Sequence, residues 1–194
     1  MSDPSAFQQI IDAHKYFVQL RYEHWMQYEA YTGMWWLLLC AWIGPWITWL
    51  FLVKHQQITE LFVYGVTVMF TITILDAIGL SKGLWTYSIK VIPYTPYLEP
   101  IDWGILPVVY MLIYQYFPEW KGFIIAQITL ATLYSFVGEP LLMKRLGVYL
   151  ILDWKYIYSF PIYIILAIIP RVVIKFLYRI ERKSKMDEEE LNER

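Results

Sequence analysis

The stretch LDAIGLSKGLWTYSIKVIPYTPYLEPIDWG, residues 75–104, decides the fold, because carboxylates stand at both of its ends beside apolar runs. Asp76 lies inside the apolar run that precedes it, and Glu99 and Asp102 lie where the next run begins. A charged group at bilayer depth costs about 2.5–3.5 kcal/mol, so such residues are candidates for a functional site. The aromatic and proline-rich segment between them predicts a loop that joins two membrane helices.

The composition places the whole chain in a membrane. Of its 194 residues, 58% are hydrophobic, 19% are aromatic and only 17% are charged, with a net charge of -1. Soluble domains contain fewer apolar and more charged residues. Most charges gather near the termini and in short loops, which argues against a nucleic-acid partner. The expected partner is the lipid bilayer.

Five apolar runs approach the length of about 20 residues that crosses hydrocarbon. The sequence therefore predicts an all-α, polytopic membrane helix bundle, residues 33–180, followed by a charged tail, residues 181–194. The third run is short and contains Pro107. The predicted spans are approximately Gly33–Val53, Ile58–Leu80, Ile101–Phe117, Lys121–Met143 and Tyr156–Tyr178.

Residues 1–32 are predicted to form an amphipathic helix ahead of the bundle. Apolar side chains recur there at steps of three and four residues, with polar side chains largely opposite. Two arrangements fit this pattern equally well: packing onto the bundle, or lying in the lipid interface. The apolar face consists of Phe7, Ile10, Ile11, His14, Phe17, Val18, Tyr22 and Trp25.

Basic residues set the predicted orientation, because short cytoplasmic segments carry an excess of Lys and Arg. A basic run leaves the last span and includes Arg171, Lys175 and Arg179. This run predicts a multi-pass protein of the cell membrane with a cytoplasmic C-terminus and an external N-terminus. The opposite side also carries Lys144, Arg145 and Lys155, which weakens the contrast.

Five crossings bring the carboxylates of different spans to one face of the membrane. That face also collects aromatic and basic side chains, which is the pattern of a one-sided pocket or vestibule. The alternative is structural, since boundary carboxylates pair with nearby Lys and Arg and boundary aromatics form interfacial belts. The ligand-binding candidates are Asp76, Glu99, Asp102, Glu139, Trp85, Tyr87, Arg145 and Trp154.

The sequence motifs of several common kinds of functional site are missing from this chain. There is no glycine-rich phosphate loop, HExxH, CxxC or serine nucleophile elbow. The three histidines are not at ligand spacing, and the repeated Asp motif of intramembrane prenyltransferases is missing. The sequence therefore predicts neither a metal site nor a cofactor.

Three runs carry a resemblance to known families: LDAIGLSKGLWTY, LEPIDWGILPVVYMLIYQYF, and EPLLMKRLGVY with the following DWKYIYSFPIYI. They resemble a family of small, uncharacterised multi-spanning membrane proteins found mainly in spore-forming Gram-positive bacteria. This resemblance implies a bacterial plasma-membrane protein. The chain is more faintly similar to small bacterial lycopene cyclase subunits, whose spans also carry acidic residues near Trp and Pro. The matching residue types here are Asp76, Trp85, Glu99, Pro100 and Glu139.

Three function classes follow from the sequence. The first is a membrane protein that binds or passes a small polar or cationic ligand through the acidic, aromatic vestibule. The second is a membrane enzyme that acts on a lipid or isoprenoid by carboxylate acid/base chemistry. The third is a structural subunit that associates with a second copy or with a membrane partner protein. The sequence alone leaves open whether the protein is an enzyme.

Overall fold

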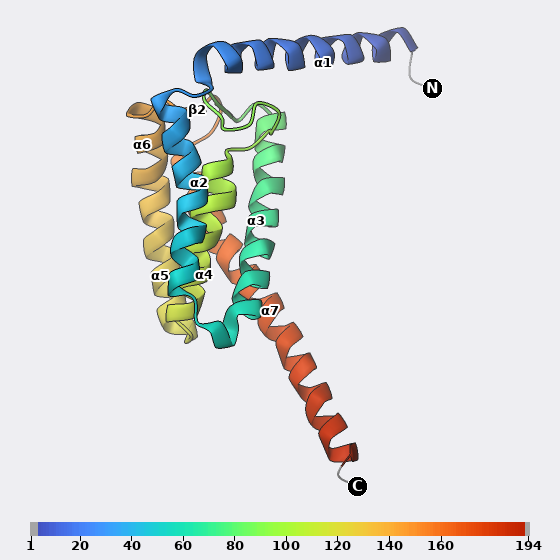
Figure 1. Ribbon diagram of the computed structural model, residues 1–194, viewed down its shortest axis with the longest axis vertical. Coiled ribbons are helices and arrows are strands. Elements are labelled where there is room, and N and C mark those ends of the chain that lie inside the picture. The colour runs from blue at the N-terminus through green and yellow to red at the C-terminus, as the bar shows by residue number, and fades with distance from the viewer. Residues whose placement is uncertain (1–3, 193–194) are drawn as a thin grey trace.

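The computed structural model describes residues 4–192, apart from the side chains of residues 4, 182 and 184–192. Figure 1 shows a bundle of upright helices with α1 lying across one end and α7 leaving at the other. The label η marks short turns of other helix types: η2 is a 3₁₀ turn, and η1, η3 and η4 are π-helical. In chain order the elements are α1 (Pro4–His24), η1 (Trp25–Glu29), α2 (Gly33–Leu52), η2 (His55–Gln57), α3 (Ile58–Ser81), β1 (Trp85–Tyr87), η3 (Pro100–Ile105), α4 (Leu106–Tyr116), α5 (Trp120–Leu133), η4 (Tyr134–Gly138), α6 (Glu139–Lys144), β2 (Tyr149–Ile151) and α7 (Tyr156–Asn192).

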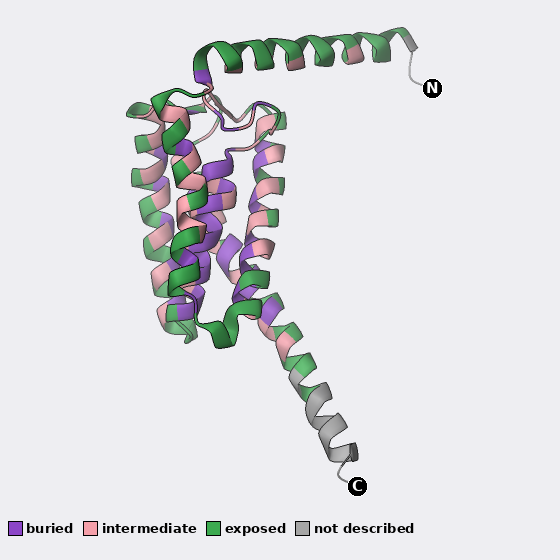
Figure 2. Ribbon diagram, in the orientation of Figure 1, coloured by how far each residue is buried: buried purple, intermediate pink, exposed green. Residues whose placement is uncertain are grey.

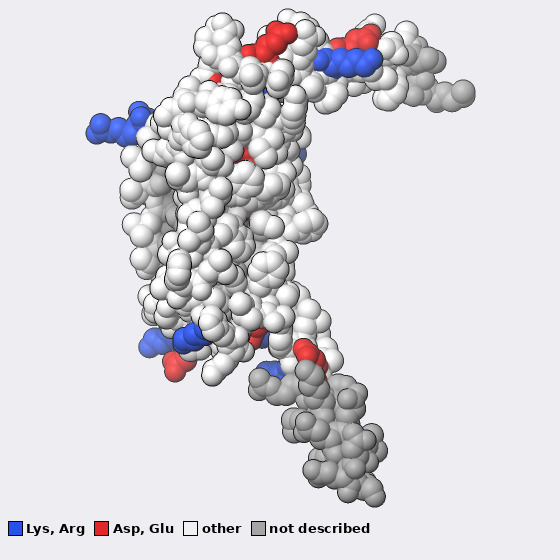
Figure 3. Space-filling model, viewed as in Figure 1, with Lys and Arg blue, Asp and Glu red and all other residues white. Residues whose placement is uncertain are grey.

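The prediction of an all-α fold is confirmed, and the described residues fit the prediction of a membrane protein. Four helices are long and apolar enough to cross a bilayer: Gly33–Leu52, His55–Ser81, Trp120–Lys144 and Tyr156–Glu181. On the face shown in Figure 3, charged side chains gather toward the two ends, and the surface between them is almost uncharged. Such a surface matches a hydrocarbon layer.

The predicted third span is the helix η3–α4, which occupies the centre of the bundle. Figure 2 shows that its residues are among the most buried in the protein, with Tyr110 and Met111 fully enclosed. Gly104 permits the closest approach, since a Cβ there would lie 2.9 Å from the backbone of Ala41 and Trp42 on α2. This helix is short, and its burial means that it needs little contact with lipid.

The connections differ between the two ends of the bundle. At the end away from α1 they are short. There Gln115, near the end of α4, accepts from Lys54 N at 2.8 Å and donates to Leu52 O at 3.0 Å, which ties α4 to the connection between α2 and α3. At the other end, two long loops meet through the antiparallel strands β1 and β2. These short strands were not part of the all-α prediction. Glycines with positive φ, Gly83 and Gly147, lie ahead of them.

Helix α1 is firmly attached at its C-terminal end, although most of its surface is exposed. Glu29 is buried and accepts two hydrogen bonds from the Arg21 guanidinium, at 2.6 and 2.8 Å. The same carboxylate accepts the backbone N–H of Lys90 at 2.8 Å, and the Trp25 indole donates to Lys90 O at 3.0 Å. Because charge-assisted hydrogen bonds are strong, this junction fixes the direction in which α1 leaves the bundle.

The C-terminal part of α7 continues well beyond the bundle. Its backbone is helical to Asn192. Most side chains of the predicted charged tail, residues 181–194, lie outside the described residues.

Candidate functional site

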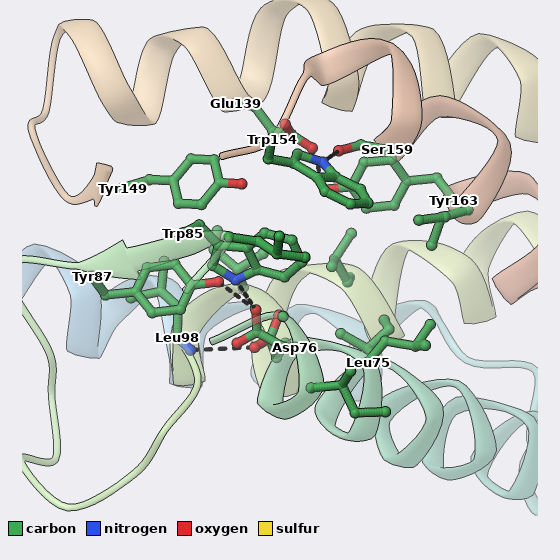
Figure 4. Close-up of a pocket in the computed structure, with 18 of the residues that line it drawn as sticks. Leu75, Asp76, Trp85, Tyr87, Leu98, Glu139, Tyr149, Trp154, Ser159 and Tyr163 are labelled. Carbon is green, nitrogen blue, oxygen red and sulfur yellow. Dashed lines mark hydrogen bonds between the residues drawn. The ribbon is translucent and has the colours of Figure 1, made fainter. Parts of the chain in front are cut away.

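A cavity of about 310 Å³ lies at the α1 end of the bundle, below the paired strands. Its walls come from α3, η3, α4, α6, α7 and both strands, and most of them are apolar. Figure 4 shows polar groups on two facing walls, with Asp76 on one and Glu139 on the other. The polar and aromatic lining residues are Asp76, Lys82, Trp85, Tyr87, Asp102, Glu139, Tyr149, Trp154, Ser159 and Tyr163.

Asp76 forms the first wall together with strand β1. Its Oδ1 accepts the Trp85 indole N–H at 2.6 Å and the Tyr87 hydroxyl at 2.7 Å. Trp85 and Tyr87 are two residues apart in a strand, so both point to the same side. Gly79 makes room for this contact, because a Cβ at that position would lie 2.1 Å from the Trp85 ring. The sequence of α3 therefore provides both the carboxylate and the space for its indole donor.

Asp102 meets Asp76 from η3, and the two carboxyl groups are within hydrogen-bonding reach of each other. Asp102 accepts the backbone N–H of Leu98 at 3.2 Å. Asp76 Oδ2 is buried and receives no donor from the described residues. Two carboxylates in contact repel each other unless one is protonated, so this geometry requires a shared proton or an added cation.

Glu139 forms the opposite wall at the start of α6. Its Oε1 accepts the Tyr163 hydroxyl at 3.0 Å, and the Ser159 hydroxyl is a second donor within reach. Ser159 itself accepts the Trp154 indole N–H at 2.9 Å. Glu139 Oε2 is buried without a donor among the described residues. The rings of Trp85 and Trp154 meet edge to face, with centroids 5.2 Å apart, and so connect the two walls.

No described Lys or Arg lies within 4.0 Å of the Asp76, Asp102 or Glu139 carboxyl oxygens. Lys82 is exposed, so it belongs to the rim of the cavity. Arg145 is also exposed and does not line the cavity. No described Lys or Arg therefore pairs directly with these carboxylates, and the buried Lys90 acts on Asp76 only through longer-range attraction.

Glu99 is fully buried behind the cavity rather than in its wall. It accepts the Thr95 hydroxyl, and Lys90 Nζ donates to Thr95 O at 2.5 Å. Burial raises the pKa of Glu99 and lowers the pKa of Lys90, because each charged form loses water. Asp102 interacts electrostatically with both Glu99 and Asp76. The carboxyl groups of Glu99, Asp102 and Asp76 therefore form a series that leads from the loop to the cavity.

The structure brings together six of the eight candidates from the sequence. Asp76, Asp102, Glu139, Trp85, Tyr87 and Trp154 line the cavity, whereas Glu99 and Arg145 do not. Asp76 pairs with Asp102, and Glu139 faces them from the other wall. Sequence reasoning missed Ser159 and Tyr163 on α7. Their spacing of four residues within an apolar run puts two hydroxyls on one helix face, which is the signal that could have revealed them.

No family model, curated protein or solved structure matches this chain. Among the described residues, no group of three or more His, Cys, Asp or Glu side chains is arranged to hold a metal ion.

Proposed function

We propose that the protein binds an amphipathic cation, a molecule with an apolar body and an ammonium-like head. One observation carries this proposal: three buried carboxyl groups face a largely apolar cavity, with no described Lys or Arg at ion-pair distance. Asp76 Oδ2 and Glu139 Oε2 each lack a donor among described residues. Leaving a buried acceptor unpaired costs about 1–3 kcal/mol, and more when it is charged. A ligand cation placed between the two walls would remove that cost.

The aromatic lining supports the same ligand class. A cation held near the face of Trp or Tyr gains about 0.5–2 kcal/mol, most when it is removed from water. Trp85 and Trp154 stand between the two acidic walls. The volume of about 310 Å³ falls at the lower end of the range for small-molecule sites. The head group would therefore meet carboxyls and indoles together.

An opening toward lipid supports an apolar body. Leu75 and Ile78 line the cavity from α3 and are also exposed on the outside of the bundle. From α7, Ile162 and Leu166 line the same cavity, and farther from the cavity α3 and α7 are joined where the Tyr64 hydroxyl donates to Ala167 O at 3.1 Å. A ligand dissolved in the bilayer would enter through this side.

Binding to the purified protein tests the proposal. Titration calorimetry would compare a quaternary alkylammonium with a neutral alcohol and an alkyl sulfate of the same chain length. We expect saturable binding of the ammonium alone, and a loss of at least about tenfold, 1.4 kcal/mol, in Asp76→Asn. Asp153→Asn is the matched control, because Asp153 is an exposed carboxylate of a nearby loop that does not line the cavity. Equal binding of all three ligands would contradict the proposal.

A membrane enzyme acting on a lipid or isoprenoid is the second candidate, and the contact between Asp76 and Asp102 favours it. A carboxylic acid in this pair would transfer its proton to one carbon of a double bond, leaving a carbocation beside the indoles. A carboxylate such as Glu139 would then remove a proton from a neighbouring carbon. The double bond would move or a ring would close without any change in composition. Incubation in D₂O with polyisoprenoids tests this: deuterium should enter the product with wild type and not with Asp76→Asn.

We infer five crossings, with η3–α4 as the central span. At about 1.5 Å per residue this helix is shorter than the hydrocarbon layer, but it is enclosed by its neighbours. Helix α1 and the C-terminal part of α7 lie at opposite ends of the bundle in Figure 1, as an odd number of crossings requires. The basic run of α7 favours a cytoplasmic C-terminus, and the family resemblance favours a bacterial plasma membrane. Reporter fusions at the two termini should give opposite signals, and matching signals would exclude five crossings.

A further inference from the structure

Helix α1 carries an apolar face that described residues cover only at its C-terminal end. The helix runs across the end of the bundle and then projects past α3 (Figure 1). Large apolar side chains on the projecting part are well exposed: Phe7 at 58%, Ile10 at 64% and Phe17 at 61%. On a helix of 21 residues, a continuous exposed apolar face of this kind marks a surface that contacts a partner or a membrane.

Contacts at the attached end show which way this face points. Val18 and Tyr22 lie beside Tyr94 of the α3–η3 loop, and the rings of Tyr22 and Tyr94 stack with centroids 6.0 Å apart. Trp25 also reaches this loop through its bond to Lys90 O. Because Phe7, Ile11, Val18 and Trp25 are separated by multiples of about 3.6 residues, they share this face.

The opposite face is polar and internally paired. Gln8 donates to Asp12 at 3.0 Å, and Gln19 donates to Glu23 at 2.9 Å. These side chains are exposed, and Gln19 stands at the edge of this polar face, since it also borders the hollow beside Tyr94. The helix therefore turns its apolar side in the direction of the bundle and its polar side away from it.

We propose that α1 docks lengthwise on the lipid surface at the cavity end of the bundle. Its apolar face points along the bundle toward the region beside α3, and α3 exposes Leu75 and Ile78 there. In a membrane that region is filled by lipid. The apolar face of α1, which lies across the end of the bundle, and the outer surface of α3 would therefore contact the same lipid. Any other occupant would have to stand where the bilayer lies. This docking does not depend on the ligand of the cavity.

The Glu29 junction makes the docking specific. Arg21 and Glu29 are joined at 2.6 and 2.8 Å, and Glu29 also holds Lys90 N. These bonds fix the direction of α1 before it meets lipid, which lowers the entropy lost on docking. The helix then covers the bilayer beside the opening between α3 and α7, the path by which an apolar ligand would reach the cavity.

Site-directed spin labelling of the full-length protein in phospholipid vesicles tests the proposal. The single cysteine, Cys40, is replaced by Ser, and labels are placed one at a time at residues 7–19. The measured quantity is the ratio of accessibility to oxygen, which partitions into lipid, over accessibility to a water-soluble nickel complex. We expect a period of 3.6 residues, with the highest ratios at positions 7, 11, 14 and 18 and the lowest at 9, 12 and 16, about half a turn away.

Three results would overturn the proposal. Uniformly high nickel accessibility would mean that α1 stays in water. Spin–spin broadening at positions 7 and 14 would mean that a second copy covers the face. Maxima on the polar face would mean that the helix is rotated. All labelled positions are on an exposed helix, and a parent-like thermal unfolding curve for each variant shows that the bundle is intact.

Discussion

Replacing Gly79 by Ala should disturb the site through one side chain, the Trp85 indole. An added Cβ would lie 2.1 Å from Trp85 Cζ2 and 2.2 Å from Cη2, so the ring must move. Overpacking of this kind costs about 1–3 kcal/mol. Movement of the ring also weakens the 2.6 Å bond to Asp76, and a hydrogen bond to a charged group is worth about 1.5–3 kcal/mol. Alanine regains about 1 kcal/mol through its higher helix propensity, so the net loss is about 1.5–5 kcal/mol.

Equilibrium unfolding in mixed micelles measures this loss, with Gly44→Ala as the control. A Cβ at Gly44 meets nothing within 4 Å, so that variant should match or slightly exceed wild type. A double-mutant cycle identifies the cause: in a Trp85→Ala background, Gly79→Ala should cost less than about 1 kcal/mol. An equal cost with and without the indole would refute the reasoning, because the clash would then lie elsewhere.

Two further predictions concern charged groups at opposite ends of the bundle. Burial raises the pKa of Glu99, so the folded protein keeps a proton that the unfolded chain releases above about pH 4.3, and stability falls as the pH rises through this window. Glu99→Gln should flatten the decline that thermal unfolding shows as the pH rises above about 4.3; parallel curves would contradict this. Arg171 is fully buried, donates to Phe117 O at 3.0 Å and Pro118 O at 2.5 Å, and its guanidinium lies 3.8 Å from the Phe123 ring. Arg171→Lys should cost about 2–3 kcal/mol, because an ammonium cannot reproduce the planar fork, and an unchanged unfolding midpoint would show that the fork is not needed.

The apolar runs and the isolated carboxylates could be predicted from the sequence, because both are local patterns of neighbouring residues. Asp76 and Glu139 stand out since each interrupts an apolar run near its end. Following the crossings was enough to place them at the same end of the bundle. The approximate limits of the long apolar helices are set by the same pattern of hydrophobicity, but four described helices, rather than the predicted five, are long and apolar enough to cross a bilayer.

The contact between the Asp76 and Asp102 carboxyls could not be predicted, because it depends on how each helix is rotated about its own axis. The sequence places Asp76, Asp102 and Glu139 at one face of the membrane and does not indicate which two of these carboxyls meet. In the structure the π-helical turn η3 brings Asp102 to Asp76, and η4 precedes Glu139. A π-helical turn shifts the angular position of every later residue, and no simple sequence pattern announces it.

The two strands were missed for a related reason. Each is three residues long, and their pairing joins segments that are far apart in the chain. Such pairing depends on tertiary contact rather than on local propensity. It nevertheless builds the site, since β1 positions Trp85 and Tyr87 over Asp76.

The central claim is that the two acidic walls hold the charged head of a ligand between the indoles. Anomalous diffraction from crystals grown with a quaternary ammonium that carries an iodobenzyl group tests it most directly. The account predicts an iodine peak in the apolar part of the cavity, with the ammonium beside Asp76 and Glu139 and against Trp85 or Trp154. The same crystals of Asp76→Asn should show a much weaker peak. An iodine peak at full occupancy elsewhere, with the cavity unchanged, would contradict the claim.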